Sequence, residues 1–290
     1  MTVIDLSDFP VEIDADPVIT TSHAEVISIW GSAASGKTML ASNLAFELAA
    51  QKLRVLLIDL DSRRPSLAAL MGLVDAGPGI TALTRLARQG RLDEGEMTRL
   101  SAEIKFGHNR LDVITGMNAN LRWPELDEAG LGGLMEVAKR SYDFVVLDLN
   151  DELEEGLVST RSDSDRNFAT RWSLQICDRI LAVFATDPVG ISRFLFDVRE
   201  FEHEYWAVGN LVSPSTVGKN PIRQIREVLH QVGRIDPKAL LPEDRSAVQW
   251  QVATGKPLLL SPRSSKLSNA IHTLALDLLD ARARPLNSSA

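Results

Sequence analysis

The most constraining feature of the chain is a short segment rich in glycine, serine and alanine between an apolar run and a helical one. Residues 30–38 read Trp-Gly-Ser-Ala-Ala-Ser-Gly-Lys-Thr, a complete Walker A pattern. Backbone N–H groups of such a loop can wrap nucleotide phosphates. The apolar, β-branched run 25–30 predicts a buried strand before the loop, and the Ala- and Leu-rich run after it predicts a helix. The free N–H groups and dipole of that helix favour a phosphate at its N-terminus. The alternative is an ordinary turn with a solvated lysine.

The loop and the residue after it define a candidate nucleotide site. We expect the site to be lined by Gly31, Ser32, Ala33, Ala34, Ser35, Gly36, Lys37, Thr38 and Met39. Lys37 would reach the β- and γ-phosphates and is a candidate catalytic residue, while the Thr38 hydroxyl would bind Mg²⁺.

Apolar runs alternate with helical patterns from residue 25 onward. Strand candidates are 26–30, 54–59, 111–114, 144–148, 180–185 and 207–211, and helix candidates lie near 38–51, 65–71, 79–89, 125–140, 166–177, 190–203, 221–231, 245–254 and 265–282. The strand candidates are continuously apolar rather than alternating, which is typical of strands buried on both faces. Because helices separate them, we predict an α/β fold with a doubly wound, mostly parallel sheet flanked by helices.

Length and composition are compatible with one such domain. The chain has 290 residues, of which 44% are hydrophobic. We expect an acidic, loosely ordered extension over 1–23, a P-loop domain over 24–282 and a frayed tail over 283–290. The net charge of −8 argues against a broad nucleic-acid surface. The single cysteine, Cys177, excludes an internal disulfide. We see no signal-like start and no long apolar run, and therefore expect a cytoplasmic protein.

Two carboxylates, Asp59 and Asp61, end the second predicted strand. The carboxyl ends of parallel strands line the ligand crevice of such sheets. A carboxylate there can hold a water bound to Mg²⁺ or position an attacking water. We therefore expect Asp59 at the metal and Asp61 in catalysis. The alternative is that one of them only caps the helix that follows.

A third carboxylate, Asp148, ends the run Tyr-Asp-Phe-Val-Val-Leu-Asp over 142–148. Four apolar residues followed by aspartate form the Walker B pattern, which is weak alone but stronger behind a Walker A loop. We expect Asp148 to hold Mg²⁺ through water, together with Thr38.

Together, these motifs resemble the MinD/ParA superfamily of P-loop ATPases over nearly all of residues 24–282. The resemblance implies ATP or ADP with Mg²⁺ as cofactors and a face-to-face homodimer. It further implies that Asn210, in Ala207-Val-Gly-Asn-Leu-Val, recognises adenine, and that Pro242 belongs to the family's late Pro-x-Asp element near the nucleotide.

Finer segments at 122–126, 166–170, 187–190 and 241–245 resemble actinobacterial proteins akin to CpaE and TadZ. This resemblance implies a localisation or assembly factor for pilus or secretion machinery. Its partner would be a protein of a membrane-associated assembly, and the factor could be recruited to the inner face of the membrane or to a pole. The alternative is a partitioning or septum-site ATPase with an ATP-dependent dimer cycle.

The chain departs from the superfamily at Ser32, where a signature lysine usually stands. That lysine reaches the partner's phosphates across the dimer, and Ser32 cannot supply its charge. Such charge stabilisation can change the rate of hydrolysis by several powers of ten. We therefore expect nucleotide binding with weak ATPase activity at most.

Two arginine sets and the last helix complete the candidates. The segment 151–171 contains Arg161, Arg166 and Arg171, any of which could replace the missing lysine, unless the segment is a solvated loop. A second set, Arg85, Arg88, Arg91 and Arg99, could contact lipid or DNA, but fits an ordinary solvated helix face at this net charge.

The last predicted helix, 266–282, has an apolar stripe along one face and acidic residues on its polar face. This suits packing on the sheet better than direct membrane insertion.

Overall fold

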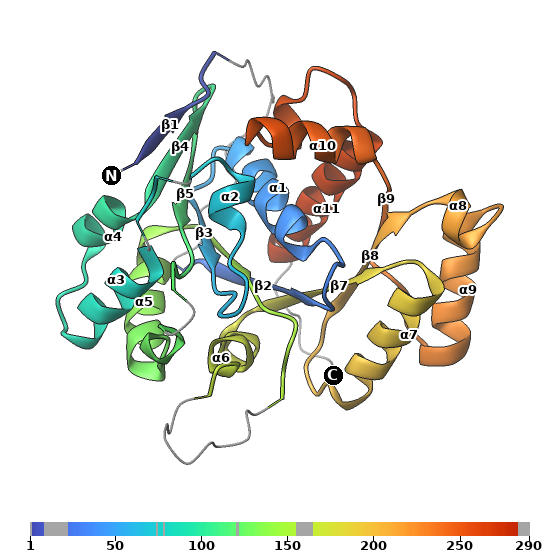
Figure 1. Ribbon diagram of the computed structural model, residues 1–290, viewed down its shortest axis with the longest axis horizontal. Helices are drawn as coiled ribbons and strands as arrows, with labels where there is room; N and C mark the ends of the chain where they lie inside the picture. The colour runs from blue at the N-terminus through green and yellow to red at the C-terminus, as the bar shows by residue number, and fades with distance from the viewer. Residues whose placement is uncertain are drawn as a thin grey trace.

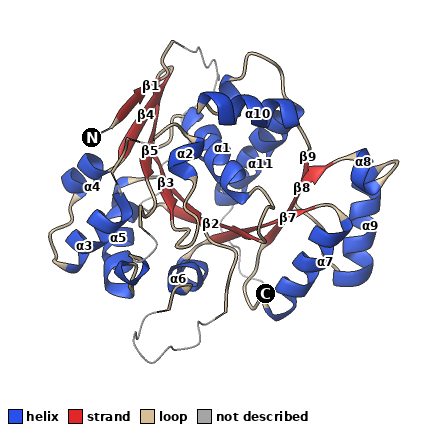
Figure 2. Cartoon of the chain, viewed as in Figure 1, coloured by secondary structure: helices blue, strands red, loops and turns tan. Residues whose placement is uncertain are grey.

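The computed structural model describes residues 2–8, 23–73, 75–77, 79–119, 122–154 and 165–283. Within them, one nine-stranded sheet is ordered β1-β4-β5-β3-β6-β2-β7-β8-β9, with helices on both faces (Figures 1 and 2). The strands are β1 Val3–Asp5, β2 Glu25–Gly31, β3 Val55–Asp59, β4 Ala102–Phe106, β5 Asn109–Ile114, β6 Phe144–Asp148, β7 Arg179–Ala185, β8 Trp206–Val212 and β9 Ala239–Pro242. Every pairing is parallel except β4 with β5, which confirms the predicted doubly wound, mostly parallel sheet.

The central strands form the two-sided core that continuous apolar runs predict. All residues of β2, β3 and β6 are buried. Gly31, at the end of β2, lies against β7 so closely that a Cβ there would fall 2.0 Å from the Val183 carbonyl oxygen. Only glycine permits this approach, and it fixes the position from which the loop departs.

One face of the sheet is covered by α1 Lys37–Ala50, α10 Arg245–Thr254 and α11 Lys266–Ala283. Leu40 and Leu44 of α1 meet Leu274 and Leu278 of α11 in this half of the core. The last helix therefore packs its apolar stripe against the domain, as its charge pattern predicts.

The other face is covered by a longer series of helices. These are α3 Gly79–Arg88, α5 Glu128–Ser141, α6 Phe168–Ile176, α7 Pro188–Asp197 and α9 Pro221–Gly233. Shorter elements join them: α2 Leu67–Leu70, α4 Glu94–Leu100, α8 Pro214–Val217, and the 3₁₀ turns η1 Trp123–Glu125, η2 Val198–Glu200 and η3 Leu258–Leu260.

Three strands, β1, β4 and β9, two helices, α4 and α8, and the turn η3 were not predicted from the sequence. β4 carries Glu103 and Lys105 between its apolar residues, and β9 has four residues and ends in Pro242. Such short edge or hairpin strands lack the continuous apolar run of central strands. Residues 3–5 of the segment expected to be loosely ordered form β1 on β4, while 9–22 and 284–290 lie outside the described residues.

Candidate nucleotide site

The Walker A loop connects β2 to α1 at the carboxyl edge of the sheet. Gly36, the residue before α1, has φ +83°, and Ala34 has φ +63°. The N-terminus of α1 has no side-chain cap and no acidic residue in its first turn. Its free N–H groups and dipole are therefore available to an anion, as the sequence predicts.

Asp148 lies beside this loop at the end of β6. It pairs in register with Ile29 of β2 on one side and with Asp59 of β3 on the other. Its side chain is fully buried, and no ordinary hydrogen bond reaches either carboxylate oxygen within the part of the chain that the structure describes. Burial, and then the neighbouring Asp59, raise the pKa of Asp148 well above its usual value, while Thr38 and Lys37 oppose the rise.

Asp59 is also buried, but its carboxylate is hydrogen-bonded. Its oxygens accept bonds from the backbone N–H groups of Asp61 at 3.1 Å, Ser66 at 3.0 Å and Leu67 at 3.1 Å. Burial nevertheless raises the pKa of Asp59 to about 7, and the charge of Asp61 adds to the rise. Asp59 therefore caps the start of α2, as the alternative interpretation of the sequence proposed. It also lies next to Asp148. Its role at the metal stays a prediction.

Asp61 forms a local turn. Its Oδ1 accepts the backbone N–H groups of Arg63 and Arg64, each at 2.8 Å. This bonding fixes the carboxylate beside Asp59 without showing whether it positions a water, so its catalytic role also stays a prediction.

Asn210 contacts the loop itself. Its Nδ2 donates to the Ser35 carbonyl at 2.9 Å, and its Oδ1 accepts the Leu211 N–H at 2.8 Å. A Cβ on Gly36 would lie 2.4 Å from that Nδ2 atom. Asn210 therefore positions the loop, a role that the sequence comparison with adenine-recognising residues did not predict.

A pocket of about 180 Å³ opens next to Asn210. Met39, Asn210 and Pro242, three residues predicted from distant parts of the sequence, line it together. Leu211, Val248 and Leu267 complete its apolar walls. Its lining also includes four polar residues, Glu243, Asp244, Arg245 and Gln249. A pocket with apolar walls and amide groups beside a phosphate loop has the character of a site for a planar base.

A buried polar network joins the segments that follow β3 and β6. Asn150 Nδ2 donates to Ser62 Oγ at 3.0 Å, and Ser62 Oγ donates to the Arg166 carbonyl at 2.7 Å. Arg63 donates to Asn167 and forms an ion pair with Glu152. Sequence reasoning missed Ser62 and Asn167. The signal at Asn150 was the run Leu149-Asn150-Asp151 after the Walker B aspartate, where the superfamily usually has Pro-Pro or Gly.

The arginines of 151–171 are engaged where the structure describes them. The Arg166 guanidinium donates to the Ser62 carbonyl at 3.3 Å, and Arg171 forms an ion pair with Asp165. Arg161 lies outside the described residues. These contacts hold Arg166 and Arg171 to the segments that follow β3 and β6. The proposed substitution for the missing lysine stays a prediction.

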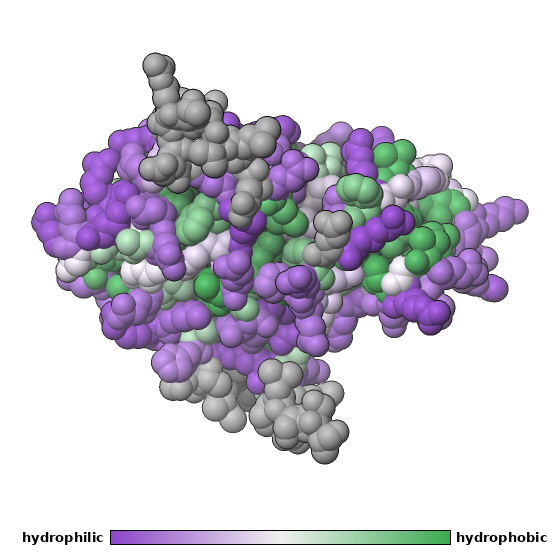
Figure 3. Space-filling view, turned by 90° about the horizontal axis from the view of Figure 1, so that it is seen from below, coloured by the Kyte–Doolittle hydropathy of each residue, from purple (hydrophilic) through white to green (hydrophobic). Residues whose placement is uncertain are grey.

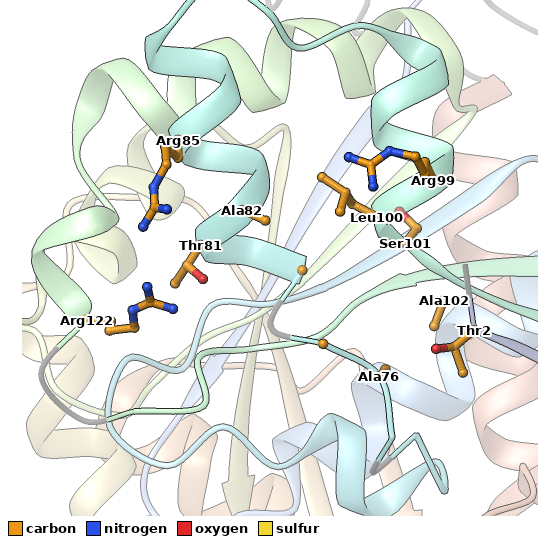
Figure 4. A pocket seen from close by; sticks show the side chains of 12 residues that line it. Thr2, Ala76, Thr81, Ala82, Arg85, Arg99, Leu100, Ser101, Ala102 and Arg122 are labelled. Carbon is orange, nitrogen blue, oxygen red and sulfur yellow. The ribbon is translucent and has the colours of Figure 1, made fainter.

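Two arginines of the second set, Arg85 and Arg99, line a pocket of about 320 Å³ beside α3 and α4 (Figure 4). Arg85 pairs with Glu125 at 3.1 Å, Arg88 with Asp127 at 2.9 Å, and Arg99 with Glu96 at 2.5 Å. Arg122, which faces Arg85 across the pocket, shares Glu125. These ion pairs match the reading of a solvated, charge-balanced helix face.

The donor set fits a nucleotide-bound Mg²⁺ better than an independent metal centre. Among the described residues no group of three or more His, Cys, Asp or Glu could hold a metal ion alone. Mg²⁺ commonly binds through one or two carboxylates, waters and substrate phosphates. Thr38 and the unpartnered oxygens of Asp148 would be the protein ligands of this Mg²⁺.

Across the described ranges, no helix has the length and apolarity needed to cross a membrane.

The loop, the carboxylates and the sheet define the class of the protein: an α/β protein of the P-loop nucleotide-binding type. Residues 29–246 match the family described as the CobQ/CobB/MinD/ParA nucleotide binding domain. The match spans well over half of the chain, and the chain belongs to this family.

Solved structures agree on the fold. A ParA family ATPase from Chlorobium tepidum has a TM-score of 0.73 and 18% identity, over 89% of this chain and 100% of that one. The septum site-determining protein MinD from Pyrococcus horikoshii, complexed with Mg-ADP, has a TM-score of 0.67 and 19% identity, over 91% and 100%. The MinC:MinD complex of Aquifex aeolicus gives 0.62 and 19%, over 92% and 100%. No protein of curated function matches the chain by sequence.

Proposed function

We propose that the protein binds ATP or ADP with Mg²⁺ at the loop 31–38. The observation that carries the proposal is Asp148, a fully buried carboxylate without a hydrogen-bond partner among the described residues, placed beside Thr38 and Lys37. An unpartnered buried charge is costly, and a cation bound at this point would offset that cost. The uncapped start of α1 and the apolar pocket beside Asn210 support the same ligand.

Each residue has a role in this proposal. The backbone of 31–39 holds the phosphates, Lys37 contacts the β- and γ-phosphates, and Thr38 and Asp148 hold Mg²⁺ with Asp59 behind them. Asp61 positions a water, and Asn210 and Pro242 border the base. The relative from Pyrococcus horikoshii was solved with Mg-ADP, which supports this choice of ligand.

The proposed activity is that of a slow ATPase that acts as a scaffold. Ser32 leaves the loop without the superfamily's signature cation, so turnover is weak. We place the protein with localisation and assembly factors akin to CpaE and TadZ: a cytoplasmic homodimer recruited by a protein partner to a membrane-associated machine. The alternative is a partitioning or septum-site ATPase, which shares the site and differs in an ATP-dependent dimer cycle.

Calorimetric titration with Mg·ADP and Mg·ATP tests the binding site. Lys37→Ala removes the phosphate-contacting cation, and we expect at least tenfold weaker binding, about 1.4 kcal/mol. Lys105→Ala removes an equal charge on β4, four positions from β2 in the strand order and outside the lining of the base pocket, and should bind as the wild type does. Equal affinity of the Lys37→Ala and wild-type proteins would refute the assignment of this loop.

A further inference from the structure

A third pocket lies between α7, α8 and α9, and its lining shares no residue with the phosphate loop. Its volume is about 390 Å³. Six of its lining residues are apolar: Pro188, Ile191, Leu195, Val217, Ile225 and Val228. We call it the α7–α9 groove. Its size and apolar walls suit side chains of a partner rather than a single water or ion.

The apolar surface continues from the groove onto the outside of both helices. Nine large apolar side chains are exposed among the described residues, and five of them lie on α7 and α9: Val189, Phe196, Ile222, Val228 and Val232. Phe196 is 73% exposed. Figure 3 shows hydrophobic residues gathered on the side of the molecule that these helices form in Figure 1. Such a gathering is typical of an interaction surface, whereas scattered apolar residues are not.

The sequence of α9 explains this surface. Ile222, Ile225, Leu229 and Val232 follow helical spacing along one face, but only Ile225 and Leu229 are buried against the domain. The two ends of the apolar face therefore remain without cover from the described part of the chain.

A buried polar atom also borders the groove. The hydroxyl of Thr186 is fully buried and has no hydrogen-bond partner among the described residues. The Thr186 N–H donates to the Asn210 carbonyl at 3.0 Å, and the Asn210 side chain holds Ser35 of the phosphate loop. Two hydrogen bonds, through Asn210, therefore connect Thr186 in the groove lining to Ser35 in the phosphate loop.

The segment that forms α8 and α9 is basic within a negative chain, whereas α7, on the other side of the groove, carries Arg193 against Asp187 and Asp197. Residues 214–234 contain four basic residues, Lys219, Arg223, Arg226 and Arg234, against one acidic residue, Glu227, while the whole chain carries −8. Arg223 and Arg226 form ion pairs with Glu227 and Asp236. No ion pair between described residues involves Lys219 or Arg234, so these two cations are available to an acidic ligand.

From the apolar lining and the two cations at the ends of α9, Lys219 before its N-cap and Arg234 at its C-cap, we propose that the α7–α9 groove docks an acidic amphipathic helix of a protein partner. The helix would place its apolar side chains in the groove and its carboxylates toward Lys219 and Arg234. This inference rests on the proposed function as a scaffold, to which it adds the docking surface and the chemistry of the partner.

A designed peptide tests the inference directly. The probe is a fluorescein-labelled amphipathic helix of about 18 residues, or five turns, with Leu and Phe on one face and Glu on the other. A companion peptide has Lys in place of every Glu. Fluorescence anisotropy measures both against the full chain. Val228→Asp and Val232→Asp place a carboxylate on the proposed surface, and Val252→Asp, on α10, is the matched control. Val232 and Val252 are each 63% exposed, so neither substitution disturbs the core.

We expect the Glu peptide to bind the wild type and the Val252→Asp variant equally. Both variants on α9 should bind it at least tenfold more weakly, and the Lys peptide should bind the wild type at least tenfold more weakly than the Glu peptide. Absent binding of the Glu peptide, equal binding to all variants, or equal binding of both peptides would overturn the proposal.

Two further measurements separate other occupants. Self-association of the wild type that Val228→Asp abolishes in sedimentation would replace the partner helix by a second copy of this chain. Vesicles of phosphatidylglycerol that bind the wild type but not Val228→Asp, with no peptide binding, would replace it by a membrane surface. Either result overturns the proposal. Mg·ADP titration of the same samples is independent of the groove, so loss of nucleotide binding would instead count against the proposed function.

Discussion

Asp59 and Asp148 are register partners at the ends of β3 and β6, and both carboxylates are buried at the carboxyl edge of the sheet. Two adjacent buried carboxylates repel each other when both are charged, and burial alone already disfavours the charged forms. The pKa of Asp59 rises to about 7 and that of Asp148 rises well above its usual value. The protein without a cation is therefore strained electrostatically at the place where Mg²⁺ is proposed to bind.

This relationship predicts how stability changes with pH in the absence of nucleotide and Mg²⁺. A carboxyl whose pKa is higher in the folded state binds more protons there than in the unfolded state, so the free energy of unfolding falls as pH rises. For Asp59 the fall runs from about pH 4 to about pH 7 and amounts to at most about 4 kcal/mol, at 1.36 kcal/mol per unit. Urea unfolding at pH 5 and pH 8 measures the difference.

Asp148→Asn provides the matching variant, because the carboxylate it neutralises has no hydrogen bonds to lose among the described residues. Without ligand at pH 8, we expect the variant to be more stable than the wild type by about 1 kcal/mol or more, and its stability to depend less on pH. It should also lose the stabilisation that Mg·ADP gives the wild type. A variant less stable than the wild type at pH 8 would contradict this account of Asp148.

The second prediction concerns the strained loop residue Ala34. Its φ of +63° lies in the left-handed region, which costs a residue with a Cβ roughly 1–2 kcal/mol, whereas Ala33 beside it has no positive φ. Ala34→Gly relieves this cost but adds about 0.5–1 kcal/mol of unfolded-state entropy. We expect it to be neutral or slightly stabilising.

Ala33→Gly is the control, because it brings only the entropic penalty and should destabilise by about 0.5–1 kcal/mol. Thermal unfolding of the two variants should therefore separate them by about 1 kcal/mol. An Ala34→Gly protein as destabilised as Ala33→Gly would show that residue 34 does not hold this conformation in solution.

The third prediction separates two roles of Asn210, which holds the Ser35 carbonyl and also borders the apolar pocket. Asn210→Ala leaves a buried carbonyl without its partner and frees the loop at Gly36. If Asn210 positions the loop, the variant should bind both Mg·ADP and Mg·pyrophosphate at least tenfold more weakly, because pyrophosphate contacts only the loop. Unchanged affinity for pyrophosphate, with weaker ADP binding, would assign Asn210 to the base alone.

The fold and the main elements of this site could be predicted because they depend on local patterns. Continuous apolar strands, the Walker A loop and the aspartate at 148 are each readable over fewer than ten residues, and the sheet then brings their ends together. Asn210 and Pro242, which line one pocket with Met39, were predicted to lie near the nucleotide from the family resemblance alone. The pairing of Asp59 with Asp148 across two strands, and the Ser62–Asn150 network, depend on strand order and side-chain geometry, which a single sequence does not reveal.

The fourth prediction concerns catalysis at Ser32. Because serine cannot supply charge to the partner's phosphates, we expect the wild-type protein to hydrolyse ATP far more slowly than the 1–100 s⁻¹ typical of kinases, on the order of tenfold or more. Ser32→Lys, combined with Ala33→Gly and Ala34→Gly, should raise turnover, measured as phosphate release. Ser32→Ala is the control and should match the wild type. A wild-type rate within that range would mean that another cation replaces the lysine. Arg161, Arg166 and Arg171 would then be the first residues to mutate.

The last prediction concerns assembly. A ligand shifts an equilibrium between monomer and dimer only by its difference in affinity for the two states. In the superfamily the signature lysine contacts the nucleotide of the partner, which makes the dimer depend on the γ-phosphate. With Ser32 in that place, this contribution is absent, and we expect the oligomeric state to be the same with no nucleotide, with ADP and with a non-hydrolysable ATP analogue. Sedimentation velocity in the three conditions measures it, and Ser32→Lys is the variant in which nucleotide dependence should return. A monomer-to-dimer change that only the ATP analogue causes in the wild type would refute the argument from Ser32 and favour the partitioning-type cycle.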